Sequence, residues 1–144
     1  MSVDIVFLDA NVLFSAAYRL GAGLRRFWEL EAVELVTSAY AAEEARSNLR
    51  DADQRQRLRF LLALVRVVED VADLPLPPDV ELPPKDRPIL VAAMRAGATH
   101  LVTGDVMHFG RYFGRRIGGV LVQKPADFLA GRAILPGAGE SDSA

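Results

Sequence analysis

Near its start the chain reads IVFLD at residues 5–9, and this stretch decides the fold. A short apolar run with β-branched residues that stops at an acid is typical of a buried parallel strand with a carboxylate at its carboxyl end. The pattern returns as HLVTGD at residues 100–105, where Gly104 and Asp105 close a second apolar run. The two stretches therefore predict parallel strands that each end beside an aspartate.

Helical patterns separate the predicted strands. Apolar residues recur at helical spacing between them, and Ser38 and Asp86 are well placed to cap helices. The proline-rich stretch 74–84 lacks the backbone donors for a continuous ladder and is predicted to be an extended connector. The expected elements are strands at 5–8, 34–37, 100–103 and 119–122, and helices at 11–18, 24–30, 38–49, 58–65, 86–97 and 125–129.

Strands that alternate with helices argue for an α/β domain. We predict a three-layer α/β/α sandwich with a central, mostly parallel sheet covered on both faces. A chain of 144 residues fits one domain with a single core. We expect that domain to span residues 1–135, and we expect the small residues of 136–144 to form a disordered tail.

Composition narrows the class of protein. A hydrophobic content of 51%, a charged content of 25% and a net charge of -2 describe a soluble globular protein. The lack of cysteine excludes disulfides, thiol catalysis and thiolate zinc sites, and it is compatible with a reducing cytoplasm. The apolar run before Asp9 lacks a basic segment and is too short for a signal peptide or a membrane span. We therefore expect a cytoplasmic protein without a membrane partner.

Several acids stand where predicted elements begin or end, or on a helix face that can turn inward; they are Asp9, Glu44, Asp86 and Asp105. Ligands of open parallel sheets bind beyond the carboxyl ends of the strands, where Asp9 and Asp105 both lie. Converging carboxylates repel one another and stay ionised together only when a cation neutralises them. Because the donors are oxygens, the predicted ion is Mg²⁺ or Mn²⁺, and the implied reaction is phosphodiester hydrolysis.

The same motifs resemble those of a known family. The stretches FLDAN (7–11), EARSNL (44–49), KDRPIL (85–90) and LVTGD (101–105) are similar, in this order, to motifs of the PIN domain. That fold is found in metal-dependent ribonucleases, including toxins of bacterial toxin–antitoxin pairs. The resemblance implies that the four acids hold the metal, that Asn11 and Thr103 support them, and that the partners are an RNA substrate and an antitoxin.

One stretch departs from the family pattern. Many PIN domains carry a further acid shortly after the last aspartate, whereas this chain continues VMHF at residues 106–109. Either His108 or a water molecule occupies that space, and we predict that His108 contacts substrate. Arg115 is predicted to bind an RNA phosphate, because an acidic rim needs nearby cations to attract RNA. Glu43 is a rival for Glu44, but it lies about 100° further round the helix.

The sequence thus predicts a Mg²⁺- or Mn²⁺-dependent endoribonuclease of the PIN type. One alternative is a catalytically inactive PIN-fold module that binds RNA or a protein. Another is a phosphohydrolase of a different α/β fold, although Asp9-Ala10-Asn11 lacks the second aspartate that such a nucleophile motif needs. The chain has more apolar residues than a small core needs, and this apolar surplus predicts a homodimer or an antitoxin-binding groove. The residues concerned are Leu24, Phe27, Trp28 and Leu61.

Overall fold

A computed structural model of the chain describes residues 2–70 and 73–136. Within these residues the strands form one 6-stranded sheet in the order β3-β2-β1-β4-β6-β5. Neighbouring strands are parallel except for the antiparallel pair β5–β6 at one edge. The strands are β1 (Asp4–Leu8), β2 (Val33–Ser38), β3 (Arg66–Val68), β4 (His100–Val102), β5 (Arg116–Ile117) and β6 (Val120–Gln123).

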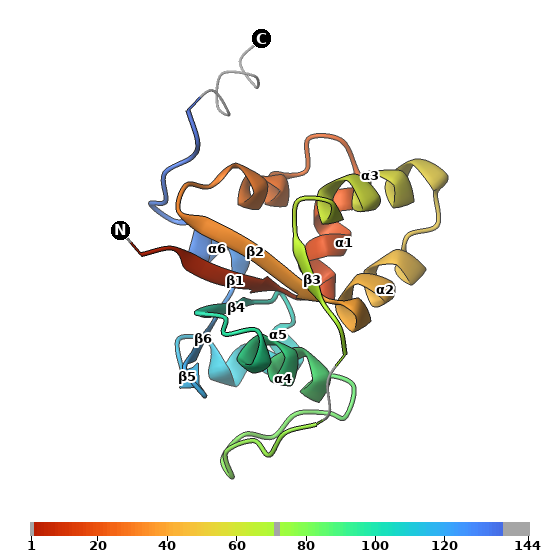
Figure 1. Ribbon diagram of the computed structural model, residues 1–144. Helices are drawn as coiled ribbons and strands as arrows, with labels where there is room; N and C mark the ends of the chain where they lie inside the picture. The colour runs from red at the N-terminus through yellow and green to blue at the C-terminus, as the bar shows by residue number, and fades with distance from the viewer. Residues whose placement is uncertain (1, 71–72, 137–144) are drawn as a thin grey trace.

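Helices cover both faces of this sheet (Figure 1). From β1 the chain moves to β2 and β3 at one edge and then crosses back to β4 and β6, so right-handed crossovers place the earlier and later helices on opposite faces. The result is the three-layer α/β/α sandwich predicted from the sequence. The earlier helices are α1 (Ala10–Tyr18), η1 (Gly23–Glu29), α2 (Ala39–Asn48) and α3 (Ala52–Leu62); the later ones are α4 (Arg87–Arg95), α5 (Val106–Phe109) and η2 (Gly110–Tyr112). The last helix, α6 (Pro125–Leu129), follows β6 and packs against η1, so it joins the earlier helices on their face of the sheet.

The middle of the sheet forms the centre of the core. Phe7 and Leu8 of β1 and Leu101 of β4 are fully buried, as expected for parallel strands with helices on both faces. The predicted inward stripe of α4 is also buried, including Ile89 and Leu90. Each large side chain of this kind contributes about 1.5–3 kcal/mol on burial, so the central strands hold the sheet edge that carries the acids.

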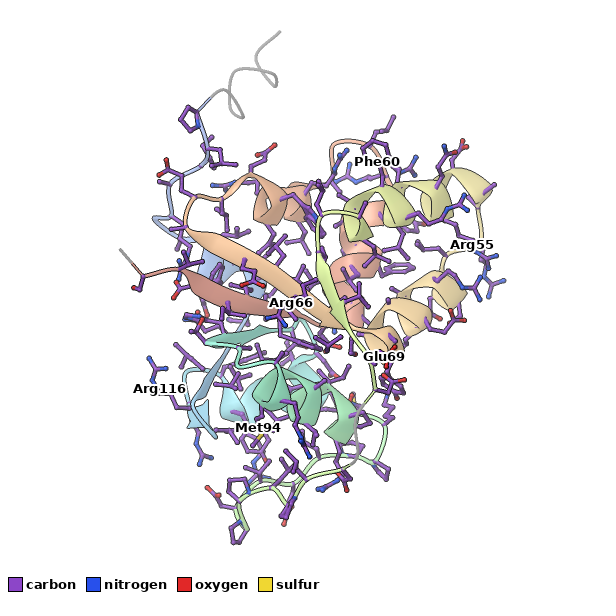
Figure 2. All side chains as sticks on the ribbon, in the orientation of Figure 1. Arg55, Phe60, Arg66, Glu69, Met94 and Arg116 are labelled. Atoms are coloured by element: carbon purple, nitrogen blue, oxygen red, sulfur yellow. The ribbon has the colours of Figure 1, made fainter. Side chains whose placement is uncertain are left out.

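The helix that follows β2 starts and ends as its sequence predicts. The Ser38 hydroxyl accepts a hydrogen bond of 3.1 Å from the backbone N–H of Ala41 and caps α2. The start of α3 is tied to the end of α2, because Arg55 Nε donates to the Leu49 carbonyl at 2.8 Å. The Arg55 side chain is labelled in Figure 2. Asp86 is the N-cap residue of α4 and Pro88 lies in the first turn, as predicted, but the Asp86 side chain makes no capping hydrogen bond.

Two further predictions need correction. The segment predicted as a helix at 24–30 is the 3-10 helix η1, a geometry typical of short connectors. The apolar surplus is smaller than predicted, because Phe27 and Leu61 are 1% and 3% exposed. Phe27 stacks on Phe128 of α6, with ring centroids 5.6 Å apart, and Trp28 Nε1 donates to the Leu61 carbonyl. Many of the apolar side chains that were predicted to be in excess therefore belong to the core of this one chain.

The ends of the chain add little to the fold. Of the predicted tail at 136–144, only Pro136 belongs to the described residues, and the rest lies outside them. None of the described helices is long and apolar enough to span a membrane.

Candidate metal centre

The centre lies where the order of the strands reverses. Strands β1 and β4 are neighbours, and Leu8 is paired with Val102 at their carboxyl ends. The backbone N–H of Asp9 donates to the Val102 carbonyl at 3.1 Å, so Asp9 and Thr103 leave the sheet side by side. Open α/β sheets bind their ligands at such switch points.

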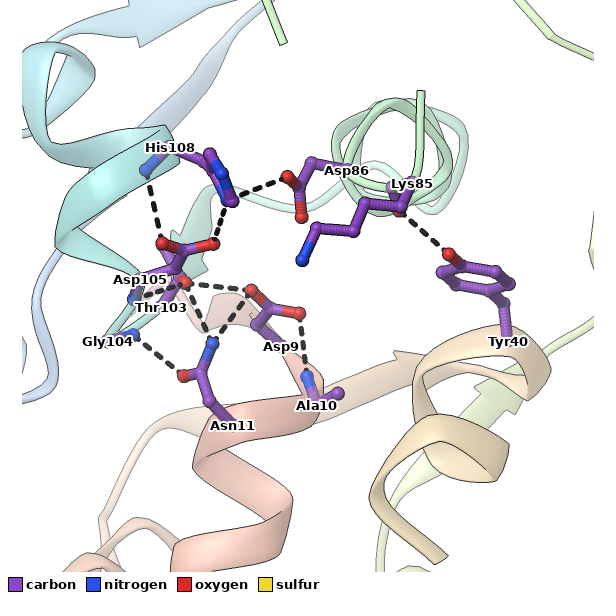
Figure 3. A network of polar contacts seen from close by, with 10 residues as sticks. All are labelled: Asp9, Ala10, Asn11, Tyr40, Lys85, Asp86, Thr103, Gly104, Asp105 and His108. Carbon is purple, nitrogen blue, oxygen red and sulfur yellow. Dashed lines mark hydrogen bonds and ion pairs between the residues drawn. The ribbon is translucent and has the colours of Figure 1, made fainter. Parts of the chain in front are cut away.

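Asp9 is held by hydrogen bonds on both carboxylate oxygens (Figure 3). Its Oδ1 accepts from the backbone N–H of Ala10 at 2.7 Å, and its Oδ2 accepts from the Thr103 hydroxyl at 2.7 Å and Asn11 Nδ2 at 3.1 Å. The Asn11 Oδ1 accepts from the backbone N–H of Gly104 at 2.7 Å. Asn11 and Thr103 therefore lie beside Asp9 and fix its orientation.

A second group of side chains adjoins this network. The Thr103 hydroxyl accepts from the backbone N–H of Asp105 at 3.1 Å, which links the acid after β1 to the acid after β4. Asp105 in turn caps α5, and its Oδ2 lies 2.8 Å from His108 Nδ1. Asp86 Oδ2 lies 3.1 Å from the same ring nitrogen (Figure 3).

The four predicted acids line one cavity of about 360 Å³ together with Asn11 and Asn48. They come from four separate segments: the ends of β1 and β4, the middle of α2 and the start of α4. The rival Glu43 lies outside this cavity, because it is exposed and bonded to Arg46 at 2.7 and 2.8 Å. The structure thus brings Asp9, Glu44, Asp86 and Asp105 together, and their role remains a proposal.

Neighbouring charges and burial both disfavour the ionised form of these acids. Burial raises the pKa of Asp9 to about 6, the hydrogen bonds from Thr103 and Ala10 oppose that rise, and the charges of Glu44 and Asp86 add to it. Burial also raises the pKa of Asp86, although His108 opposes the shift. The site is therefore costly to keep ionised without a cation.

The donor set fits a hard divalent cation. Carboxylate oxygens dominate the cavity, as Mg²⁺ and Mn²⁺ prefer. In addition, Asp86 is only 8% exposed, and among the described residues its Oδ2 has no hydrogen-bond partner. A buried carboxylate oxygen without a donor is costly unless something else satisfies it, and a cation held by these acids would do so.

Sequence reasoning gave no role at the site to four lining residues: Ala10, Phe14, Asn48 and Lys85. The position of Asn48 was readable in part, because its four-residue step from Glu44 puts both on one face of α2. Lys85 begins the family-like stretch KDRPIL, but that resemblance assigned it no role; its carbonyl accepts a hydrogen bond of 2.8 Å from the Tyr40 hydroxyl. Arg115 does not line the cavity; its guanidinium pairs with Asp79, so its predicted phosphate contact remains a prediction.

Comparison with known proteins agrees with this arrangement. The PIN domain family model matches residues 5–107, which include the four acids. The chain belongs to the PIN domain family. No curated protein matches it.

Solved structures with a similar fold include two VapBC proteins and one VapC protein. VapBC2 from Rickettsia felis, bound to a promoter DNA fragment, is 16% identical, with 83% of this chain and 98% of that chain covered and a TM-score of 0.57. VapBC-1 from nontypeable Haemophilus influenzae is 18% identical, with 85% and 98% covered and a TM-score of 0.53. VapC20 from Mycobacterium tuberculosis, a Sarcin-Ricin loop cleaving toxin, is 14% identical, with 78% and 98% covered and a TM-score of 0.51. These likenesses support the fold.

Proposed function

We propose that this protein is a Mg²⁺- or Mn²⁺-dependent endoribonuclease that acts in the cytoplasm as the toxin of a toxin–antitoxin pair. The observation that carries the proposal is the convergence of Asp9, Glu44, Asp86 and Asp105 in one cavity of a PIN domain. The similar fold of a Sarcin-Ricin loop cleaving toxin and of two VapBC proteins supports an RNA substrate and an antitoxin partner.

The proposed chemistry depends on how rigidly the acids are held. A divalent ion bound by them would supply a Lewis acid for phosphate oxygens and lower the pKa of a water molecule. Asn11 and Thr103 keep Asp9 from rotating, and Thr103 also fixes the backbone of Asp105. The four acids would therefore meet the ion in a preorganised arrangement, which is what electrostatic catalysis requires.

A neighbouring cavity gives the RNA strand a path to the acids. Phe14 lines both the acidic cavity and a second cavity of about 850 Å³. Phe14 and Tyr18 place their rings 5.4 Å apart in this second cavity, and such rings can stack with bases. Its exposed cations have no ion pair within the described residues and are suited to phosphates; they are Arg19, Arg26 and Lys124.

A catalytically inactive PIN-fold module that binds RNA or a protein is the second candidate. It is favoured by the absence of a further acid in residues 106–109, where His108 contacts the last aspartate instead. Incubation of single-stranded RNA with the purified protein separates the two candidates. The ribonuclease cuts it with Mn²⁺ or Mg²⁺ and stops in EDTA, whereas the inactive module leaves it intact under both conditions.

A further inference from the structure

His108 is directed into the acidic cluster by its own short helix. The backbone N–H of His108 donates to Asp105 Oδ1 at 3.1 Å, which closes the first turn of α5. The same turn places the His108 ring back over Asp105, so that Nδ1 lies 2.8 Å from Oδ2. The ring is mostly buried, with 25% of the side chain exposed.

A second carboxylate faces the same ring nitrogen. Asp86 Oδ2 lies 3.1 Å from His108 Nδ1 without forming a hydrogen bond, and it has no other partner in the described part of the chain. One nitrogen atom can hold one proton at most, and that proton can be directed well at only one of the two oxygens. A contact with Asp105 therefore leaves Asp86 Oδ2 unsatisfied.

We propose that His108 Nδ1 is a ligand of the same divalent ion as Asp86 and Asp105, and that this nitrogen makes the site prefer Mn²⁺ to Mg²⁺. The inference rests on the proposed metal dependence. One donor atom from each of the three residues lies within 4.8 Å of the others. Neighbouring ligands of an octahedral ion with bonds of about 2.1 Å are ~3 Å apart, which matches the separations of 2.8 and 3.1 Å between His108 Nδ1 and the two oxygens.

The nature of the donor sets the metal preference. Mg²⁺ strongly favours oxygen ligands. Imidazole nitrogen suits transition-metal ions better, and Mn²⁺ is an ion of the first transition row that also takes carboxylate ligands. Many PIN domains carry a further acid shortly after the last aspartate, and in this chain that stretch offers the imidazole of His108 instead, so a neutral nitrogen donor is available in place of a charged oxygen. The opposing interpretation is that the charged imidazole pairs with both carboxylates and keeps the cation out.

Electron paramagnetic resonance of bound Mn²⁺ tests the proposal directly. A directly bound imidazole gives a nitrogen hyperfine coupling, which we expect in the wild-type protein and not in His108→Gln. The chain has only 2 histidines, so His100 is the internal control. It lies on β4, where its Nδ1 contacts the Thr99 hydroxyl at 2.8 Å and its ring meets Phe128 edge-on. A coupling that persists in His108→Gln would overturn the assignment.

Calorimetric titration gives the second measurement. His108→Gln should weaken Mn²⁺ binding at least about tenfold and Mg²⁺ binding much less, while His108→Asp should bind Mg²⁺ more tightly than the wild type does. Tighter Mn²⁺ binding by His108→Gln would show that the ring excludes the ion and would overturn the proposal. If wild-type protein bound no Mn²⁺ at all, the proposed metal dependence itself would fail. If Mn²⁺ bound and Asp105→Asn abolished binding, but no nitrogen coupling appeared, only the assignment of His108 would fail.

Discussion

At the scale of single residues, the hydroxyl of Thr103 is the link between the two halves of the site. It donates to Asp9 Oδ2 and accepts from the backbone N–H of Asp105, and it is fully buried. Thr103→Val keeps the shape of the side chain but removes these two hydrogen bonds and the one that the hydroxyl accepts from Asn11 Nδ2 at 3.2 Å. We expect Mn²⁺ affinity to fall about 10–100-fold in Thr103→Val and to stay near wild type in Thr103→Ser, measured by calorimetry. Equal affinities in the two variants would contradict this role.

Asp9 should dominate the response of the protein to metal. An ion that binds only the folded state stabilises it by mass action, by about 2.7 kcal/mol at a concentration one hundred times Kd. Mn²⁺ should therefore raise the melting temperature of the wild type and barely change that of Asp9→Asn. Asp127→Asn is a matched control, because Asp127 is exposed on α6 and outside the acidic cavity. A full response by Asp9→Asn would show that Asp9 is not a ligand.

The metal-free protein should also depend on pH in an unusual direction. The pKa of Asp9 is about 6 in the folded state against an ordinary value of 3.8, so the folded protein takes up a proton more readily than the unfolded chain. Ionised Asp9 thus destabilises the fold above about pH 6, and this cost is relieved as the pH falls from 7 towards 5. The raised pKa of Asp86 acts in the same direction.

In EDTA, therefore, the melting temperature of the wild type should rise between pH 7 and pH 5. The rise should be smaller in Asp9→Asn, which has no charge to neutralise at this position. A steady fall in wild-type stability over this range would mean that the raised pKa of Asp9 does not control the stability of the site.

At the scale of elements, the orientation of α2 decides whether Glu44 reaches the site. Ser38 caps this helix from the carboxyl end of β2, and its side chain is 1% exposed. Ser38→Ala should cost about 1 kcal/mol of the free energy of unfolding in urea titrations. Ser47→Ala is the control, because the Ser47 hydroxyl is exposed and, within residues 2–70 and 73–136, donates only to the Glu44 carbonyl of the same helix. Similar losses in both variants would argue against a special role for the cap.

Elements with strong local patterns could be predicted from the sequence, and short edge strands could not. Strands β1 and β4 are buried on both faces, so continuous apolar runs identify them. Strands β3 and β5 have 3 and 2 residues and each begins with an exposed arginine. Their pairing depends on contacts with β2 and β6, which no local pattern records.

The residues of the candidate site also divide into those that local sequence patterns predict and those that depend on distant contacts. Its four acids could be placed at one edge because topology brings the ends of parallel strands together. The position of Lys85 beside these acids could not be predicted, because Lys85 ends a connector whose course depends on distant contacts. One of these is Tyr112, whose hydroxyl accepts from the N–H of Glu81 at 2.6 Å and donates to its carbonyl at 3.0 Å. The sequence also could not predict that Asp86 Oδ2 lacks a hydrogen-bond partner among the described residues. The N-cap position of Asp86 predicts a capping hydrogen bond, and that bond is absent.

At the scale of the whole molecule, RNA cleavage tests whether the assembled site is an enzyme. Single-stranded RNA should be cut with Mn²⁺ or Mg²⁺ and not with EDTA. Asp9→Asn and Asp105→Asn should each lose activity by orders of magnitude, because each removes a carboxylate from the cavity where the ion is proposed to bind. Lys124→Ala should instead weaken RNA binding and reduce its salt dependence, if the cavity that Lys124 lines receives the strand.

Contaminating nucleases are the main alternative source of such activity, so the decisive control is the Asp9→Asn, Asp105→Asn double variant purified in the same way. Its fold should be verified by its melting curve in EDTA, where the loss of two converging charges should leave it at least as stable as the wild type. Because both acids belong to one cavity, the double variant should be no more active than the weaker single variant. Activity that survived unchanged in this folded variant would belong to another protein, and the RNA- or protein-binding module would then be the better account of this PIN domain.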